Sequence, residues 1–422
     1  MKPIYLVIIA LLCFSGSGGF SATISAKSLS MSDVQAAVNS AGPGDTVKVP
    51  SGSSNWSGAV TINKPIYLVG AGQGTTTIFN STSASSGLET PVFSVSLNQD
   101  QRLEISGFWV SASTPHRSNG INLYAGSILP TQIVIHDCTF KECSFGIMNG
   151  TGESGACFGV VYNCTFWNCR ITCRNSGFRD QAAMKGFATP PFPLGSPNYM
   201  VYEDDTINFT DWTGGPQGAN YLGDTEYPFN YIVRFCSFSI ARNGAITVDG
   251  YDQHGNYGRA LNDFGMIIHD NTFNYSGSSV GVKLADIRGG VNTLVFNNTI
   301  KGQGGNYISL RADPAGSVTP VGNYIWNNKN PDNSTIAVNV SAGSYTASAP
   351  AGYVELPYPH PLRASATPTP TPTPAPTPTP TPGPSATPSP TPSPSPTAPT
   401  YSNWLNRQSE WIRLNPPTPD SH

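Results

Sequence analysis

The sequence predicts an all-β fold, a parallel β-helix, in which short strands wind around one core and a short helix caps the N-terminal end. One observation is a recurring phrase: an apolar run, two or three polar residues, then Thr or Ser and an apolar residue. Its clearest copies occupy residues 134–140, 160–166, 232–238, 267–273 and 294–300, with a weaker copy at 202–208. The other is the spacing of the copies, about 25 residues at its shortest, which leaves room for two or three short strands in each repeat rather than the four of a propeller blade.

Residues 1–22 have the pattern of a secretory signal peptide, since Lys2 precedes an apolar run at 4–14 and a stretch of small residues follows it. We therefore expect a secreted, extracellular protein. No later segment approaches the roughly 18 apolar residues that a membrane-spanning helix needs, so no membrane span is expected. Only 11% of the residues are charged and the net charge is −3, which argues against nucleic acid as a partner.

Residues 23–45 are predicted to form the cap and residues 46–362 the β-helix. Ser32 is the expected N-cap of a helix, with Asp33 in its first turn. The narrow apolar stripe of this helix consists of Val34, Ala37, Val38 and Ala41. A short amphipathic helix suits a cap because the end of a solenoid has to be covered. After it come short β-rich runs separated by Gly and Pro.

Residues at the same position of successive turns of a β-helix stack into columns about 4.8 Å apart. The recurring phrase predicts an inward aromatic column of Phe140, Phe166, Phe238 and Phe273. It also predicts an amide column at a turn, made by Asn271, Asn298 and Asn323. Each amide would bond to the turn above it, which would satisfy polar groups in the interior.

Seven cysteines remain beyond Cys13, an odd number that prevents complete pairing within the chain. Three of them share the repeat position of the amides, and two more share a second position; they are Cys138, Cys164 and Cys236, and Cys143 and Cys169. Free thiols packed in columns are one interpretation. One disulfide among Cys157, Cys169 and Cys173 is the alternative.

The segments SDVQAAVNSAGPGDTVKVPSG and IYLVGAG, the ISGFWV at 105–110 and the NNTF-type phrases together resemble the pectin lyase-like superfamily of right-handed parallel β-helices. The resemblance covers roughly residues 32–354. That superfamily includes polysaccharide lyases, glycoside hydrolases, esterases, phage tailspikes and non-enzymatic surface proteins. The resemblance therefore implies the fold and an extracellular polysaccharide as partner, but it does not select one chemistry.

Residues 363–400 are rich in Pro and Thr and predict an extended linker. Residues 401–422 carry Trp404 and Trp411 and predict a short helical tail, which is too short to bury a core of its own. Three roles stay open for this tail: docking on the solenoid or a partner, remaining disordered, or contacting carbohydrate or the cell wall. Association with a cell surface or matrix would follow from the last.

The strands that follow the phrase are expected to line a groove, as active-site strands do in the enzymes of this superfamily. Their inward residues are expected to align at Val248, Leu284 and Leu310. Because side chains alternate along a strand, Asp249, Lys283 and Arg311 then point outward together on three neighbouring turns.

These three residues suggest β-elimination on a uronic-acid polymer. Removal of the proton beside a uronate carboxylate needs a base and a cation that holds the carboxylate. Lys283 next to Arg311 resembles the Lys and Arg of β-helix lyases that act on alginate and on chondroitin-type chains, and the resemblance leaves Ca²⁺ as a candidate cofactor. The acidic calcium ligands of those enzymes are not found as a full set. Solvent-exposed cations without a catalytic role are the alternative.

A second candidate is the loop DGYDQHGNYGR at 249–259, which combines acids, a histidine and two tyrosines. The residues concerned are Asp249, Asp252, His254, Arg259, Tyr251 and Tyr257. Paired carboxylates would suit an inverting glycosidase, and the aromatic rings could stack on sugars, although the hydrolase motifs NTD, GDD and GHG are absent as such. Asp286 and Arg288 in DIRGG are candidate substrate-binding residues, with an ion pair that fastens the turn as the alternative.

The sequence thus favours a secreted polysaccharide-active β-helix, with a polysaccharide lyase preferred over a glycoside hydrolase. A non-catalytic carbohydrate-binding or adhesion protein is the competing class, because the chain combines a long linker with low charge and has no intact catalytic motif.

Overall fold

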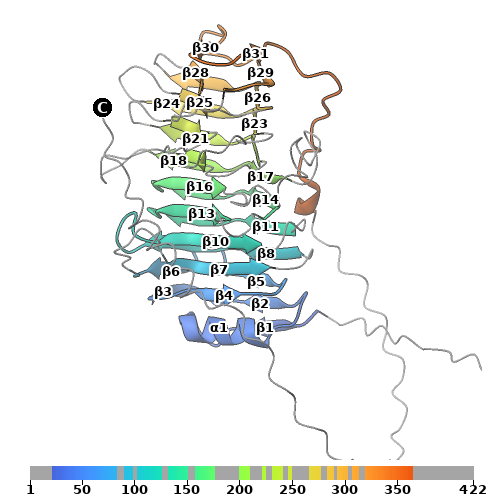
Figure 1. Ribbon diagram of the computed structural model, residues 1–422. Coiled ribbons are helices and arrows are strands. Elements are labelled where there is room, and N and C mark those ends of the chain that lie inside the picture. Colours follow the sequence, from blue (N-terminus) through green and yellow to red (C-terminus); the bar gives the residue numbers. More distant parts are fainter. Residues whose placement is uncertain are drawn as a thin grey trace, which may run out of the picture.

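The computed structural model describes residues 21–82, 90–97, 102–125, 132–150, 157–175, 199–209, 221–224, 231–240, 246–249, 266–276, 283–288, 292–302, 307–312 and 319–364. The right-handed parallel β-helix is confirmed: the strands form three sheets of 12, 10 and 9 strands, and each strand pairs in parallel with the strand one turn earlier. Figure 1 shows the turns of the solenoid, which we call rungs, stacked above the helix at the N-terminal end.

The 12-stranded sheet contains β1 (Thr23–Ser25), β2 (Thr46–Lys48), β5 (Tyr67–Val69), β8 (Arg102–Ser106), β11 (Gln132–His136), β14 (Gly159–Tyr162), β17 (Met200–Glu203), β20 (Tyr231–Arg234), β23 (Ile267–His269), β26 (Leu294–Phe296), β29 (Asn323–Trp326) and β31 (Tyr345–Thr346).

The 9-stranded sheet contains β3 (Gly52–Trp56), β6 (Thr76–Asn80), β9 (Trp109–Ala112), β12 (Thr139–Lys141), β15 (Thr165–Trp167), β18 (Thr206–Phe209), β21 (Ser237–Ile240), β24 (Thr272–Tyr275) and β27 (Thr299–Gly302). The 10-stranded sheet contains β4 (Val60–Ile62), β7 (Pro91–Leu97), β10 (Asn119–Ala125), β13 (Phe145–Asn149), β16 (Ile171–Asn175), β19 (Tyr221–Asp224), β22 (Ile246–Asp249), β25 (Lys283–Arg288), β28 (Tyr307–Arg311) and β30 (Ala337–Val340).

The recurring phrase is the corner between the 12-stranded and the 9-stranded sheet. At this corner seven rungs have a residue with a left-handed backbone, φ 50–57°: Asp137, Asn163, Asp204, Phe235, Asp270, Asn297 and Asn327. Six of the seven are Asn or Asp, the non-glycine residues that tolerate this conformation best. The phrase therefore encodes the corner, and its regular return sets the register of the whole solenoid.

The residue after each of these corner positions points into the core and forms the polar column. Asn298 donates from Nδ2 to Asn328 Oδ1 at 2.9 Å, and Asn271 donates to Asn298 Oδ1 at 3.0 Å. The prediction that Asn323 is the third member of this column is wrong. Its Oδ1 accepts a hydrogen bond from the Thr293 backbone N–H, at a different position of the rung. The equivalent residue is Asn328 because β26 pairs with β29 as Val295 with Ile325 and Phe296 with Trp326.

The aromatic column is present and fully buried. Phe140 stacks on Phe166 with ring centroids 5.1 Å apart, and Phe238 stacks on Phe273 at 4.5 Å. Ile207 fills the rung between the two pairs. All seven cysteines outside the leader are buried free thiols, so the packing interpretation holds and the alternative disulfide is absent.

The N-terminal end is capped by α1 (Met31–Ser40), whose buried side chains are Val34, Ala37 and Val38. The N-cap is Ser30, whose Oγ accepts a hydrogen bond from the Asp33 N–H; the predicted cap, Ser32, lies inside the first turn. The difference arises because two serines flank the helix start, and a cap of either would bond a backbone N–H two or three residues on.

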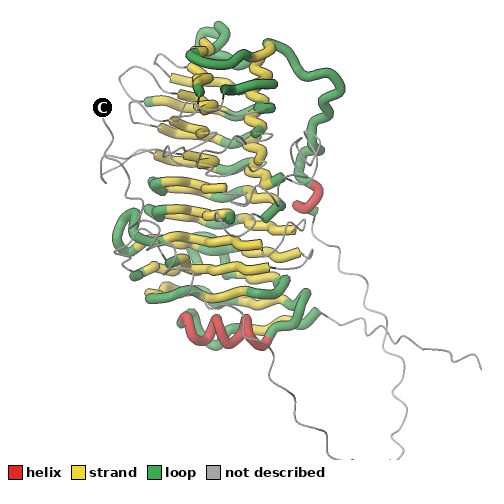
Figure 2. The backbone as a smooth tube through the Cα atoms, viewed as in Figure 1, coloured by secondary structure: helices red, strands yellow, loops and turns green. Residues whose placement is uncertain are grey.

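After β31 the chain turns back and runs along the outer face of the 12-stranded sheet, and we call residues 350–364 the C-terminal strap (Figures 1 and 2). The strap ends in a single 3-10 turn, η2 (Pro361–Arg363). Leu356 of the strap joins a second apolar cluster with Ile232, Ile267 and Leu294, which point away from the main core. The sheet is therefore buried on both faces where the strap crosses it.

The leader, the Pro/Thr-rich linker and the tail at 401–422 fall outside the described residues, apart from the two leader residues 21 and 22 and the two linker residues 363 and 364. Within the described part, no helix has the length and apolar character to cross a membrane.

Candidate functional site

Strands β22, β25 and β28 are neighbours in the 10-stranded sheet, so the three rungs of the predicted site lie side by side (Figure 1). The predicted alignment of Val248, Leu284 and Leu310 is wrong. Val248 pairs with Ala285, and Leu310 pairs with Ile287. Between β25 and β28, a register shift between Lys283 and Ala285 places one extra residue, a bulge, in β25; the pairing of β22 with β25 has no such shift.

The bulge brings Asp286 to the centre of the site. On the outer face Asp286 pairs with Asp249 on one side and with Ser309 on the other. Arg288 pairs with Arg311 two positions further along. In backbone register, an acidic position therefore occurs in both β22 and β25, and a basic position in both β25 and β28.

Asp286 binds both predicted catalytic cations. Lys283 Nζ donates to Asp286 Oδ2 at 2.9 Å. Arg311 donates from Nε to Oδ1 at 3.1 Å and from Nη2 to Oδ2 at 2.7 Å, a two-pronged contact. We call these three residues the Lys–Asp–Arg cluster.

The three side chains differ in exposure. That of Asp286 is fully buried, whereas those of Lys283 and Arg311 are 21% and 36% exposed. Burial alone would raise the pKa of the Asp286 carboxyl, but the hydrogen bond from Arg311 and the positive charges of Lys283 and Arg311 outweigh it and lower the pKa. Asp286 is therefore ionised and acts as the buried support of two partly exposed cations.

The cluster has capacity for a further anion. One carboxylate faces two cations, so the three side chains together carry a net charge of +1. Asp286 uses the Nε–Nη2 edge of Arg311, and among the described side chains no other acceptor takes the Nη1 side of Arg311 or the further N–H groups of Lys283. Both side chains reach solvent, so a carboxylate on a ligand can approach them.

The described residues do not fit the calcium site that the resemblance left open. Ca²⁺ requires several oxygen ligands, and the one described carboxylate of the cluster is already bonded to two cations. No step of the chemistry below is assigned to a metal.

Several predicted site residues cannot be placed beside the cluster. The backbones of Asp249 and Arg288 lie in β22 and β25, but their side chains are outside the described part, as are the whole of Asp252, His254, Arg259, Tyr251 and Tyr257. For the DIRGG segment, the fastening partners of Asp286 are Lys283 and Arg311.

The prediction that Lys283 and Arg311 lie together is confirmed, and the element that sequence reasoning missed is the position of Asp286 between them. The i, i+3 spacing of Lys283 and Asp286 places them on opposite faces of a regular strand. Only the bulge returns them to the same face, and a single Gly-free strand of this kind carries no sequence signal for it.

Solved structures with a similar fold include three that come from carbohydrate enzymes. One is an alginate lyase from Paenibacillus sp. str. FPU-7, with 15% identity, a TM-score of 0.41 and coverage of 75% of this chain and 99% of that one. Another is a mannuronic acid specific polysaccharide family 6 lyase from human gut microbiota, with 13% identity, a TM-score of 0.48 and coverage of 76% and 66%.

The third is the A-module of a mannuronan C-5 epimerase from Azotobacter vinelandii, with 12% identity, a TM-score of 0.31 and coverage of 78% of this chain and 95% of that one. No protein-family model and no curated protein sequence matches this chain. These likenesses concern the fold alone, so the chemistry has to be argued from the side chains.

Proposed function

We propose that this protein is exported, binds an acidic polysaccharide across the outer face of the 10-stranded sheet, and cleaves it by β-elimination beside a uronate carboxylate. The observation that carries the proposal is the buried Asp286 carboxylate, which holds Lys283 and Arg311 together at a solvent-facing site. Export rests on the signal-peptide pattern of residues 1–22.

The acidic character of the substrate follows from the charge of the cluster. Arg311 can present its Nη1 side to a substrate carboxylate while its other edge stays on Asp286, which fixes the guanidinium in place. A neutral sugar would leave the net positive charge without a partner. A uronate supplies the matching carboxylate, and its rigid ring places the neighbouring C5–H bond at a defined distance from the arginine.

The reaction assigns one role to each cation. Arg311 binds the uronate carboxylate and stabilises the negative charge that develops on it as the C5 proton leaves. Lys283, as the neutral amine, takes that proton. The C4–C5 double bond then forms, the bond from C4 to the glycosidic oxygen breaks, and the leaving oxygen takes up a proton, which Lys283 can return.

The cluster can tolerate the neutral amine because Asp286 and Arg311 remain a charge-balanced pair when Lys283 has lost its proton. No buried carboxylate is then left without a cation, a situation that would cost several kcal/mol. Asp286 is thus a positioning residue, and Lys283 and Arg311 are the residues that touch substrate.

The test is to incubate the full-length protein with polymannuronate, polyguluronate, polygalacturonate and glucuronate-bearing glycosaminoglycans. The expected result is a rise in ultraviolet absorbance from the double bond at new non-reducing ends. New reducing ends without this absorbance would show hydrolysis and overturn the elimination. Binding without either product would show a non-catalytic binding protein.

Variants connect the activity to the cluster. Lys283→Met keeps the aliphatic stem but removes the base, and we expect turnover to fall by a factor of about 100 or more. Arg311→Lys keeps the charge and loses the two-pronged contact, so KM should rise. The matched control is Lys301→Ala, an exposed cation on the 9-stranded sheet, which should leave turnover unchanged. Unchanged turnover in Lys283→Met, with a normal melting temperature, would refute the assignment.

A further inference from the structure

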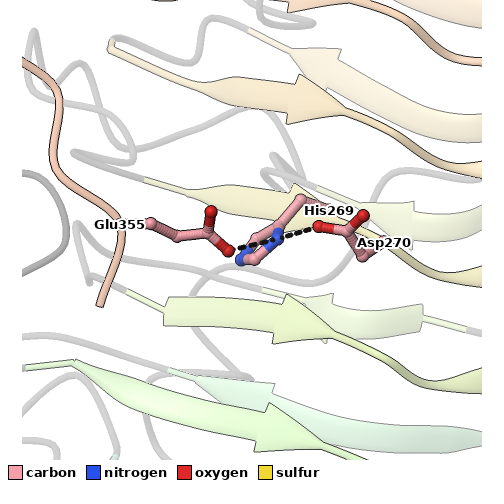
Figure 3. A group of neighbouring side chains, drawn as sticks. All are labelled: His269, Asp270 and Glu355. Atoms are coloured by element: carbon pink, nitrogen blue, oxygen red, sulfur yellow. Dashed lines mark hydrogen bonds and ion pairs between the residues drawn. The ribbon is translucent and has the colours of Figure 1, made fainter. Parts of the chain in front are cut away.

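A second cluster of ionisable side chains lies on the outer face of the 12-stranded sheet, away from the Lys–Asp–Arg cluster. His269 ends β23, Asp270 follows it in the corner, and Glu355 comes from the C-terminal strap (Figure 3). His269 Nδ1 lies 2.7 Å from Asp270 Oδ2 and 3.2 Å from Glu355 Oε1. One ligand atom from each residue lies within 4.8 Å of the other two.

The imidazole of His269 is held in one orientation. Its ring stacks on Phe296 with centroids 4.6 Å apart and an interplanar angle of 7°, and the ring of Phe235 meets it edge-on at 5.8 Å. Only 1% of the side chain is exposed. The two aromatic rings therefore aim Nδ1 at the carboxylates without any further ordering of the ring.

The cluster has more acceptors than its single donor can serve. A ring nitrogen carries at most one hydrogen, yet two carboxylates approach Nδ1. In the described part of the chain, His269 is the one cation-forming partner that either carboxylate contacts.

The same His–Asp pair occurs once more in this sheet, and the comparison separates local geometry from a ligand site. His136 Nδ1 lies 2.6 Å from Asp137 Oδ2, close to the 2.7 Å between His269 Nδ1 and Asp270 Oδ2. There, however, the second acid, Glu104, approaches the other ring nitrogen at 3.1 Å and is already bound by Arg102 at 2.6 Å. Asp137 and Glu104 thus approach different nitrogens of His136 and cannot share one ion. Asp270 and Glu355, in contrast, converge on the same nitrogen of His269.

We propose that His269, Asp270 and Glu355 bind a divalent transition-metal ion, with Zn²⁺ the best match, and that this ion fastens the C-terminal strap to the β-helix. One imidazole nitrogen and two carboxylate oxygens are common zinc ligands, at bond lengths of about 2.0–2.2 Å. At tetrahedral angles such bonds place ligand atoms about 3.4 Å apart. Side-chain movements of about an ångström would bring the three ligand atoms to these separations. Water would complete the coordination.

The location of the site gives the ion a structural role. Asp270 and Glu355 are 30% and 44% exposed, so an ion can enter from solvent while the imidazole side stays sealed by aromatic rings. Glu355 immediately precedes Leu356, whose side chain and carbonyl anchor the strap. Metal binding would thus secure the segment from which the Pro/Thr-rich linker departs.

The experiment is titration of the full-length, tag-free protein with Zn²⁺ by calorimetry, together with hydrogen exchange of the strap. We expect Asp270→Asn and Glu355→Gln each to weaken zinc binding at least tenfold, and zinc to slow exchange in the strap of the wild type but not of these two variants. The matched control is Asp137→Asn, which makes the same change in the His136–Asp137 pair and should leave zinc affinity unchanged. Asparagine is tolerated at both corner positions, so both variants should fold.

The proposal is overturned if Asp270→Asn and Glu355→Gln bind Zn²⁺ as tightly as the wild type, since the ion would then be held elsewhere. It is also overturned if zinc leaves exchange in the strap unchanged in the wild type. Ca²⁺ and Mg²⁺ are the comparison ions: they prefer all-oxygen sites, and binding of either more tightly than Zn²⁺ would contradict the imidazole ligand.

Discussion

Asp205 offers a quantitative test of how the polar column contributes to stability. It occupies the position of Asn271 and Asn298 in the rung of β17 and β18, and its Oδ1 accepts from the Cys164 backbone N–H at 2.8 Å. Its Oδ2 is buried and has no hydrogen-bond partner among the described residues. Complete burial is the main cause that raises the pKa of Asp205 well above its ordinary value, so the folded protein binds the carboxyl proton more tightly than the unfolded chain does.

We expect Asp205→Asn to stabilise the fold at neutral pH. The unfolded chain ionises Asp205 above a pKa of about 3.9, so between that pH and the raised pKa of the folded protein folding requires protonation, at a cost of about 1.4 kcal/mol per pH unit. This cost is absent below the unfolded pKa and grows as the pH rises. The Asn side chain has no such cost. Its Nδ2 can donate a hydrogen bond to the Val161 carbonyl, just as Asn271 Nδ2, two rungs later, donates to the Val233 carbonyl.

The assay is urea unfolding of the wild type and Asp205→Asn between pH 4 and pH 7. The difference in unfolding free energy should be near 1 kcal/mol at pH 4, from the added hydrogen bond, and should widen by about 1.4 kcal/mol per pH unit until the pH reaches the raised pKa of the folded protein. The mirror variant, Asn271→Asp, should lose stability with the same pH slope. A difference for Asp205→Asn that does not change with pH would refute the raised pKa of Asp205.

Three further predictions concern stability. Glu203→Gln leaves the fully buried Arg234 without its carboxylate, so unfolding free energy should fall by about 3–5 kcal/mol, with faster hydrogen exchange in the C-terminal strap; slow exchange there would contradict the buried ion pair as its anchor. The lowered pKa of Asp286 gives a stabilisation that is present above the pKa of the unfolded chain and lost as the pH falls through the pKa of the folded protein. In urea titrations, the unfolding free energy of the wild type should therefore exceed that of Asp286→Asn by less as the pH is lowered. Phe238→Ala opens a cavity beside Phe273 and should cost about 3–5 kcal/mol by the same assay; a loss below about 1 kcal/mol would show that the column collapses to fill it.

The solenoid was predictable because its sequence signal is local and repeated. Each corner needs a residue with a left-handed backbone followed by a residue whose side chain points inward. The recurring phrase supplies both at fixed spacing, as at Asp270–Asn271 and Asn297–Asn298. Once one copy is recognised, the stacking of Phe238 on Phe273 follows from register alone. The amide column was mispredicted at the rung of β29, where Asn323 precedes and Asn328 follows the apolar run 324–326, and only the pairing of β26 with β29 distinguishes them.

The candidate site was predictable only in part, because it depends on a departure from the repeat. Alternation placed Lys283 and Arg311 on the outer face, but the bulge that brings Asp286 between them depends on packing of both Leu284 and Ala285 into the core. The zinc-site proposal rests on Glu355, which is distant in sequence from His269. The contact exists because the strap folds back, and no local pattern encodes that return.

Mass spectrometry of the products is the direct test of whether the Lys–Asp–Arg cluster supports elimination. Elimination gives one fragment with an unsaturated end that is lighter by one water than the same fragment from hydrolysis. We expect such fragments from at least one uronate polymer with the wild type, and their loss with Lys283→Met. Fragments that have all gained water, or unsaturated fragments formed by Lys283→Met at the wild-type rate, would contradict it.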